Sequence, residues 1–468
     1  MIKKIFFLFI SIILPIVLFA QNDSLPEKRN AQKQHFFSLK GQDIVKKGCF
    51  VAPLPVLSYD QDKGWQFGAM LNIYDFGNGS FYPSPRQQWA LSASYYHKGS
   101  QQYSIIYDAK YLIPKVRLSV AANLDYDQAT NFHGFNGYMT KYDYGQVNFW
   151  AKQKDKTNMP SEYNPIFYRV EKMTFSFKVD FSGNIVGNKL FWQAGYCFDW
   201  YKWASVNREK INKGKSTDKI FEGNTLYDYF NLWGIISPQE QKGGFSSAIR
   251  LGLKYDSRDV EVFPNNGLLA EGHVRLAPHF LGTTQSYYTY YLSIRHYVSL
   301  VNDVLIFAYR WSYKGTFGKY IPYYMMSVWS VMGQESDKEG VGGYKTVRGV
   351  LKNRVQGLDV TFFNTELRYK VFKFQLWKQN WCVALNAFFE GGMVTRQYDM
   401  TYKGINDETL RKKYDEYIGT QREQFHLAAG GGVKVVVNQN FVLAIDYAHP
   451  LKKQDGNGAI YLYTGLTF

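Results

Sequence analysis

The last ten residues of the chain, 459–468, alternate between two kinds of side chain and end on an aromatic residue. One set of alternate positions is mostly apolar and runs from Ile460 to Phe468, whereas the other contains Tyr461 and Tyr463. A period of two is typical of a β-strand whose faces meet different surroundings, and about ten residues let a tilted strand cross a bilayer. The pattern predicts a membrane-spanning strand ending at Phe468, although the edge strand of a soluble sandwich has the same period.

The start of the chain has the features of an export signal. Lys3 and Lys4 precede an apolar run over 5–18, and Ala20 offers a cleavage point. The run is shorter than the roughly 20 residues of a membrane helix. We therefore expect a signal peptide over 1–20, a short periplasmic tail over 21–48 that is too small to fold as a domain, and an outer-membrane β-barrel over 49–468.

The composition argues against a helical membrane protein. The chain is 46% hydrophobic and 18% aromatic, its mean hydropathy is −0.33, and no second continuous apolar stretch follows the signal. A transmembrane barrel interleaves lipid-facing apolar residues with lumen-facing polar ones and concentrates aromatic residues at both membrane interfaces. The many Tyr, Phe and Trp residues fit that use.

The formal charge of +16 leaves several partners open. A basic protein can bind nucleic acid or a polyanionic surface, but export argues against nucleic acid. Contact with outer-membrane lipid and lipopolysaccharide is expected, yet no basic run exceeds a few residues, which favours an ordinary solvated surface over a specific lipopolysaccharide site. The three cysteines, Cys49, Cys197 and Cys382, are odd in number and widely spaced, so they predict no disulfide framework.

Sixteen segments with period-two alternation follow residue 49, and their connections alternate between short turns and long loops. Charged residues keep to one face, as expected of the lumen side of a barrel. The pattern predicts an all-β fold, a 16-stranded antiparallel transmembrane β-barrel, whose lumen is wide enough for water unless something fills it. The predicted strand centres are Leu54, Ala69, Ser92, Tyr107, Ala121, Phe175, Ala194, Arg250, Gly272, Leu292, Tyr309, Thr365, Leu385, Gly432, Ile445 and Tyr463.

One motif stands in the long loop between the eleventh and twelfth predicted strands, Val347-Arg348-Gly349. Together with the segments 55–59, 256–259, 263–267, 364–369, 389–392 and 446–451, it resembles the BamA/TamA family of outer-membrane barrels, also called the bacterial surface antigen family. The matching segments span the barrel in the family's order. The resemblance implies that the long loop folds back into the lumen.

The resemblance also implies that Arg348 contacts acidic groups on the barrel wall. The strand period independently places Glu390 and Asp446 on the inward face, and an arginine fork suits carboxylates. Both are the expected lumen partners, although the family more often has Asp where Glu390 stands. Without the neighbouring motifs, we would interpret Arg348 as one solvated loop arginine among many.

The first predicted strand carries two prolines, Pro53 and Pro55, on the same edge. Proline has no backbone donor and is normally confined to sheet edges. Because the first strand meets the last in a closed barrel, we hypothesise a weak lateral seam formed by Pro53 and Pro55 on one side and Tyr463 and Phe468 on the other. The alternative is that the prolines merely begin the strand.

No catalytic signature is present in the sequence. It has neither a His-Glu-x-x-His nor a Gly-x-Ser-x-Gly motif, so we predict no enzyme activity, no metal and no cofactor. The resemblance implies that the protein helps client polypeptides, or lipids, enter or cross the outer membrane of a Gram-negative bacterium. Family members carry periplasmic POTRA domains for which this chain has no room, so accessory proteins are expected in their place. A passive pore and a structural or adhesive surface protein are the alternatives.

Overall fold

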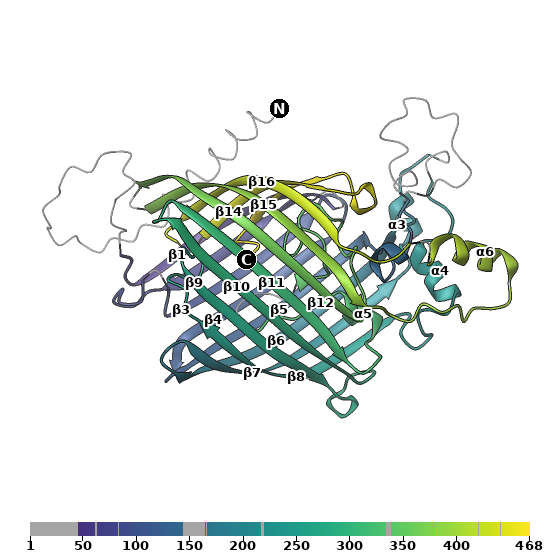
Figure 1. Cartoon of the computed structure of the whole chain (residues 1–468), viewed down its shortest axis with the longest axis horizontal. Helices are drawn as coiled ribbons and strands as arrows, with labels where there is room; N and C mark the ends of the chain where they lie inside the picture. Colours follow the sequence, from purple (N-terminus) through teal and green to yellow (C-terminus); the bar gives the residue numbers. More distant parts are fainter. Residues whose placement is uncertain are drawn as a thin grey trace, which may run out of the picture.

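The described residues form a single large sheet of sixteen antiparallel strands that curls into a barrel (Figure 1). The computed structural model describes residues 45–468 apart from 61–62, 83, 144–163, 165, 217–219, 334–337, 378, 420 and 440. The predicted signal peptide and nearly all of the predicted tail lie outside this part. Each strand pairs with its neighbour in the chain, and only β11 and β14 are separated by other strands.

All sixteen predicted strand centres fall inside barrel strands, which confirms the predicted fold class. The strands are β1 (Cys49–Asp60), β2 (Gly64–Asp75), β3 (Gln87–Tyr96), β4 (Gln101–Ile113), β5 (Val116–Asn131), β6 (Arg169–Val186), β7 (Leu190–Ala204), β8 (Gly243–Asp256), β9 (Gly267–Ala277), β10 (Tyr287–Val301), β11 (Leu305–Phe317), β14 (Asp359–Leu376), β15 (Gln379–Arg396), β16 (His426–Val437), β17 (Phe441–Pro450) and β18 (Ala459–Thr464).

The two faces of the strands differ as the alternation predicts. In β8, Leu251 and Leu253 are about half exposed on the outside, whereas Arg250 between Ile249 and Leu251 is fully buried inside the barrel. The exposed apolar side chains form the surface that faces lipid, and the charged ones point into the lumen. The barrel wall therefore has an apolar outside and a polar inside.

The connections separate into two kinds at opposite ends of the barrel. Several turns at one end, the short-turn end, contain residues with positive φ, among them Lys115, Asn188, Asp303 and Asn438, as tight hairpins require. The other end, the long-loop end, carries short helices. These are η1 (Gly137–Met139), α3 (Arg208–Asn212), α4 (Leu226–Leu232), η3 (His279–Leu281), α5 (Tyr323–Met326), α6 (Glu408–Tyr417) and η4 (Lys453–Asp455). Among the described residues, no helix is both long and apolar enough to span a bilayer.

The long loops pack together into a cap with its own aromatic core. Phe132 and Phe230 meet edge to face with ring centroids 5.2 Å apart, and Trp233 lies 5.6 Å from Phe230. Helix α4, which carries Phe230 and ends just before Trp233, begins with a complete capping box between Thr225 and Asp228. The cap covers the long-loop end of the barrel through buried apolar contacts.

The connection between β11 and β14, residues 318–358, folds into the barrel and is called the lumen loop here. It includes α5 and a small hairpin of β12 (Val328–Trp329) and β13 (Lys338–Glu339). Cations of the inner wall bind its backbone carbonyls: Lys178 Nζ and Arg250 Nη1 donate to Val331 O at 2.9 and 3.1 Å, and Lys314 Nζ donates to Met326 O. The predicted filling of the lumen by this loop is confirmed.

Candidate functional site

Arg348 of the lumen loop is buried against the barrel wall at the centre of an acidic cluster. Its Nε donates to Glu390 Oε1 at 2.9 Å, its Nη1 to Asp446 Oδ2 at 2.6 Å and its Nη2 to Glu366 Oε2 at 2.8 Å. Its backbone N–H donates to Glu390 Oε2 at 2.6 Å, and its guanidinium lies 3.4 Å from the ring centroid of Phe388. The structure thus brings Arg348, Glu390 and Asp446 together and adds Glu366.

The cluster is balanced in charge, which permits its complete burial. Glu366 also accepts from Arg368 Nε at 2.7 Å, and Lys434 Nζ lies 3.5 Å from Glu366 and 3.9 Å from Asp446. Three carboxylates therefore face three cations, and a buried ion is tolerated only when it is paired in this way. The three strands β14, β15 and β17 supply the carboxylates, so the loop position is tied to a wide arc of the wall.

The two residues beside Arg348 fit the loop closely to the wall. Gly349 has φ +90°, and a side chain there would meet Ala428 at 3.0 Å and Ala448 at 3.2 Å. Its N–H donates to the Tyr461 hydroxyl at 3.0 Å, while Val347 is fully buried in a cluster of apolar loop and wall residues. Glycine is needed here both for the backbone angle and for the close approach.

The barrel is not sealed between its first and last strands. β1 pairs with β2 and β18 pairs with β17, but no ladder joins β1 to β18. The backbone N–H of Phe76 donates to Gly48 O at 2.9 Å, and pairing continues without a shift along β1. Main-chain groups alternate between the two edges of a strand, so Pro53 and Pro55 turn their nitrogen atoms toward the open seam, where they offer no donor.

The terminal strand meets this seam with few residues. β18 has six residues against twelve in β1. Tyr463 points inward, where its hydroxyl donates to Asp446 Oδ2 at 2.5 Å, and its ring centroid lies 5.0 Å from that of Tyr344 in the lumen loop. Tyr463 therefore joins the last strand to the same carboxylate that binds Arg348.

The prediction that the last strand extends to Phe468 on the seam is wrong. β18 ends at Thr464, Gly465 has φ +87°, and the chain turns into the lumen. Phe468 is only 4% exposed and packs with Tyr297 and Ala308 of the opposite inner wall. Arg310 and Arg368 on that wall donate to the backbone oxygens of Thr467 and Phe468. In an extended strand, backbone groups of these residues would face the unpaired edge of the seam.

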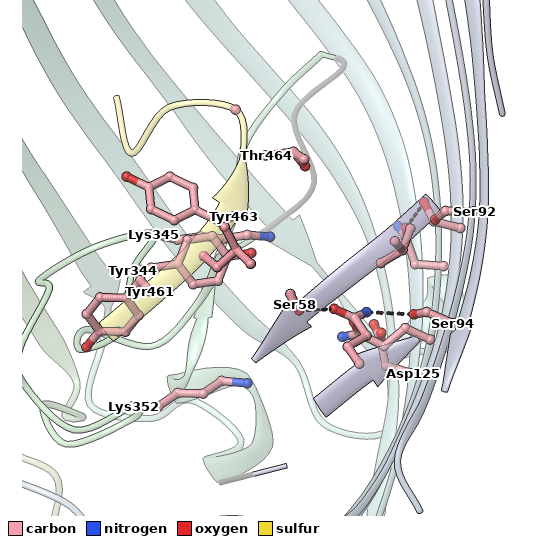
Figure 2. Close-up of a pocket in the computed structure, with 18 of the residues that line it drawn as sticks. Ser58, Ser92, Ser94, Asp125, Tyr344, Lys345, Lys352, Tyr461, Tyr463 and Thr464 are labelled. Atoms are coloured by element: carbon pink, nitrogen blue, oxygen red, sulfur yellow. Dashed lines mark hydrogen bonds between the residues drawn. The ribbon is translucent and has the colours of Figure 1, made fainter. Parts of the chain in front are cut away.

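A cavity of about 1060 Å³ lies between the seam, the lumen loop and the inner wall of the early strands. Figure 2 shows Tyr461, Tyr463 and Lys345 on one side of it and Ser58 and Ser94 on the other. The early strands line it with a hydrogen-bonded row of neutral groups: Gln66 accepts from the Ser58 hydroxyl at 2.5 Å and donates to Ser94 at 2.6 Å. The cavity thus connects the polar lumen with the open seam.

A charged group lies at the short-turn end of this cavity. Glu261, in the turn between β8 and β9, accepts from Lys110 Nζ at 2.8 Å and from Arg117 Nη1 at 3.2 Å. Burial opposes ionisation, but the two cations outweigh it and hold the pKa of Glu261 well below its usual range. Glu261 is therefore ionised across the physiological pH range.

The connection between β2 and β3 bridges the seam at the short-turn end. The Tyr82 hydroxyl lies 3.4 Å from Asn438 O and accepts from Asn380 Nδ2 at 3.1 Å. Asn380 and Asn438 belong to the β15 and β16 side of the barrel, beyond β17 and β18. Tyr82 therefore forms a strap across the foot of the seam, and the residues that border the opening lie above it.

Sequence reasoning missed the wall residues that complete the site. Glu366, Arg368 and Lys434 lie on inward positions of strands that were predicted, so the strand period could have identified them as facing Arg348. The contacts of Tyr82 could not be predicted in this way, because side chains in a turn do not alternate regularly between two faces. Within the described part of the chain, no three His, Cys, Asp or Glu side chains are grouped so that they could hold a metal ion.

Comparison with known proteins places this geometry among outer-membrane barrels. A family model described as the Omp85 superfamily domain matches residues 87–468. CdiB from Escherichia coli aligns over 90% of this chain and 63% of its own, with 8% identity and a TM-score of 0.51. BamA from Haemophilus ducreyi lacking POTRA domains 1–3 aligns over 90% of this chain and 70% of its own, with 15% identity and a TM-score of 0.49. The likeness to CdiB is one of fold, and no curated protein matches the sequence.

Proposed function

The chain belongs to the Omp85 superfamily and is an outer-membrane β-barrel, and from this premise we propose that it assists the insertion or translocation of client polypeptides through the seam between β1 and β18. The observation that carries the proposal is the open seam beside a polar cavity. In a bilayer, an unpaired strand edge is costly because lipid cannot satisfy its backbone groups. An edge that is left open is therefore suited to receive a strand from outside the barrel.

The two sides of the seam have properties that suit a temporary partner. The prolines of β1 offer no backbone donor toward β18, and the six residues of β18 are too few to pair with all twelve of β1. The cavity behind the seam offers hydroxyl and amide groups, which can bind the backbone of an extended polypeptide. The free energy for insertion would come from the folding of the client in the membrane, since backbone bonds in lipid are strongly favoured.

The lumen contents argue against a passive pore. The lumen loop and the aromatic cap fill much of the barrel interior with buried side chains, and the cavity that remains lies on the β1–β5 side, beside the seam. Lipid transport and lipopolysaccharide contact remain alternative uses of the same seam. Accessory proteins would deliver clients to the short-turn end, which is the periplasmic end of barrels with this alternation of loops.

Locking the seam tests the proposal. In a background with Cys49, Cys197 and Cys382 replaced by serine, Leu57→Cys in β1 and Leu462→Cys in β18 place thiols on the two sides of the seam. Leu57→Cys with Phe67→Cys is the matched control, because these residues are register partners in β1 and β2. The readout is the insertion of an unfolded eight-stranded barrel into proteoliposomes before and after oxidation.

We expect oxidation of the seam pair to stop insertion, reduction to restore it, and the control pair to insert at the same rate in both states. Full insertion with the seam pair fully crosslinked would contradict the proposal. A large steady conductance in planar bilayers that Arg348→Ala leaves unchanged would favour the pore instead.

A further inference from the structure

The last four residues, 465–468, form a separate segment inside the barrel and are called the terminal segment here. The N–H of Gly465 still donates to Val442 O of β17 at 2.8 Å, but beyond it the chain leaves the sheet. Thr467 and Phe468 are 3% and 4% exposed. The segment crosses from the β17 side of the lumen toward β10, β11 and β14, and Figure 1 marks the end of the chain within the outline of the barrel.

Two arginines of the inner wall hold the terminal segment. Arg310 Nη1 donates to Thr467 O at 2.8 Å, and Arg368 Nη2 donates to the main-chain oxygen of Phe468 at 2.9 Å. Both guanidinium groups lie over the Phe468 ring, with Arg310 5.1 Å and Arg368 5.2 Å from its centroid. These charge-assisted bonds and cation–π contacts are buried, so they specify one position for the segment.

The same wall residues also hold the lumen loop. Arg310 Nη2 donates to Lys345 O at 3.1 Å and approaches Thr346 O at 3.4 Å, while its Nε donates to Asn364 Oδ1. Asn364 in turn donates to Thr346 O at 2.6 Å. One arginine therefore binds the loop at Lys345 and Thr346, just before Arg348, and the terminal segment at Thr467.

Two further connections join Arg348 itself to the terminal segment. Glu366 accepts from Arg348 with Oε2 and from Arg368 with Oε1, and Arg368 holds Phe468. Asp446 accepts from Arg348 and from Tyr463, whose hydroxyl lies 3.1 Å from Thr467 Oγ1. Three separate routes of hydrogen bonds thus connect the loop and the segment.

We propose that the terminal segment is a latch whose position depends on the lumen loop, with Arg310 as the residue that couples them. While the loop is docked on the wall, the latch stays in the lumen and β18 stays short. When the loop leaves the wall, Arg310 loses Lys345 O and Thr346 O, and Glu366, which orients Arg368, loses Arg348, so both arginines hold the latch less firmly. The released latch can then extend β18, since Leu466 falls opposite Phe441 in the register of β17 and β18. The longer strand covers more of β1 and closes the seam.

The coupling acts in both directions. If docking of the loop favours the inward latch, then an inward latch favours the docked loop by the same factor. A client that pairs with the seam edge of β1 excludes the extended form of β18, so it stabilises the docked loop. This inference rests on the proposed function of the seam, to which it adds a control, but the latch position can be measured without any client.

Thiol accessibility measures the latch directly. Thr467→Cys in the serine background described above reports the segment through its rate of reaction with a water-soluble maleimide in detergent or proteoliposomes. Arg310→Met removes the coupling donors at nearly constant length. Arg117→Met is the matched control, because Arg117 is an inward arginine of β5 that is bound to Asp108 and Glu261. Heat-modifiable mobility on gels shows which variants are folded.

We expect Arg310→Met to raise the labelling rate about tenfold, the factor expected for the loss of one charge-assisted hydrogen bond, and Arg117→Met to leave it unchanged. Arg348→Ala should raise the rate as well, and the double variant should show less than the product of the two effects. The milder Arg310→Lys keeps the inference testable if Arg310→Met does not fold.

Three results would overturn the latch: an unchanged rate in folded Arg310→Met or Arg310→Lys, an equal increase in Arg117→Met, or strictly multiplicative effects of Arg310→Met and Arg348→Ala. None of these bears on client insertion, which the seam crosslink tests separately. An increase in crosslinking between Leu57→Cys and Leu462→Cys in the Arg310→Met background would support closure of the seam by the released latch, and a decrease would contradict it.

Discussion

Arg348 and Tyr463 bind the same oxygen atom, Oδ2 of Asp446, at 2.6 and 2.5 Å. One residue belongs to the lumen loop and the other to the strand that borders the seam. A carboxylate with two charge-assisted or hydroxyl donors on one oxygen holds both firmly. The loop and the seam therefore share a single anchoring point on β17.

Replacement of Arg348 should destabilise the barrel more than replacement of any exposed arginine. Arg348→Ala leaves three buried carboxylates with two cations, and breaking a buried ion pair costs about 3–5 kcal/mol. Arg348→Lys should recover part of the loss, since an ammonium cannot fork between carboxylates. Heat-modifiable gel mobility over a temperature series measures the change. Arg411→Ala, on the exposed face of α6, should stay at the wild-type midpoint, and an equal midpoint for Arg348→Ala would refute the prediction.

Alanine substitutions at two glycines with the same φ can separate the cost of backbone strain from the cost of a steric clash with the barrel wall. Gly349 and Gly343 both have φ +90°, but a side chain at Gly343 would meet nothing closer than 3.8 Å, whereas one at Gly349 would press on Ala428 at 3.0 Å. Alanine should cost about 1–2 kcal/mol at either position for the left-handed backbone, and a further 1–3 kcal/mol or so at Gly349 for overpacking. Gel-shift midpoints should therefore rank wild type, Gly343→Ala and Gly349→Ala in decreasing order. Equal midpoints for the two variants would contradict the prediction, because they would show that Ala428 moves aside without a measurable cost.

The cap should lose stability as the pH rises. Burial raises the pKa of Glu240, although the Tyr320 hydroxyl donates to it and partly offsets the rise. The folded cap thus binds this proton more tightly than the unfolded chain, and its stability falls with pH between the ordinary pKa of a glutamate and the raised one. Limited proteolysis of the cap loops from about pH 5 to pH 8 should show faster cleavage at the higher pH in wild type.

Two variants isolate the contribution of Glu240 to this pH dependence. Glu240→Gln should flatten the proteolysis profile. Asp399→Asn should leave the profile as in wild type, because the hydrogen bonds to Lys403 and Thr401 lower the pKa of Asp399 to about 2, outside the window. A steep profile that survives in Glu240→Gln would assign the effect to another group.

The strap at the foot of the seam should limit its width. Tyr82→Phe removes the hydroxyl that joins the β2–β3 connection to Asn380 and Asn438, at a cost of about 1 kcal/mol. Spin labels at Ser80 and Gln439 should then give a broader distance distribution than in wild type. Tyr288→Phe, on the exposed outer face of β10, serves as the control. Identical distributions in Tyr82→Phe and wild type would mean that the strap does not restrain the seam.

The alternation of side chains was sufficient to predict the barrel. Strands such as β8 and β11 face lipid on one side and the polar lumen on the other, so apolar and polar residues must alternate along them. The same period placed Glu390 and Asp446 on the inner wall. It failed at Phe468, since alternation continues through a bend and cannot show where Gly465 turns the chain inward. The partners of the terminal segment, Arg310 and Arg368, come from strands far away in sequence, and only the curling of the sheet into a barrel brings them to it.

The inner wall is attached to the lumen loop along an arc from β6 to β17, and Arg348 provides the attachment to β14, β15 and β17. Lys178, Arg250 and Lys314 fasten the β6–β11 side to loop carbonyls, whereas β1 to β5 face the cavity. The strands that are bound to the lumen loop should therefore be rigid, whereas β1 to β5 should bend more easily. Lateral pressure from the bilayer will bend β1 to β5 first. Membrane tension and thickness should therefore set the width of the seam between β1 and β18.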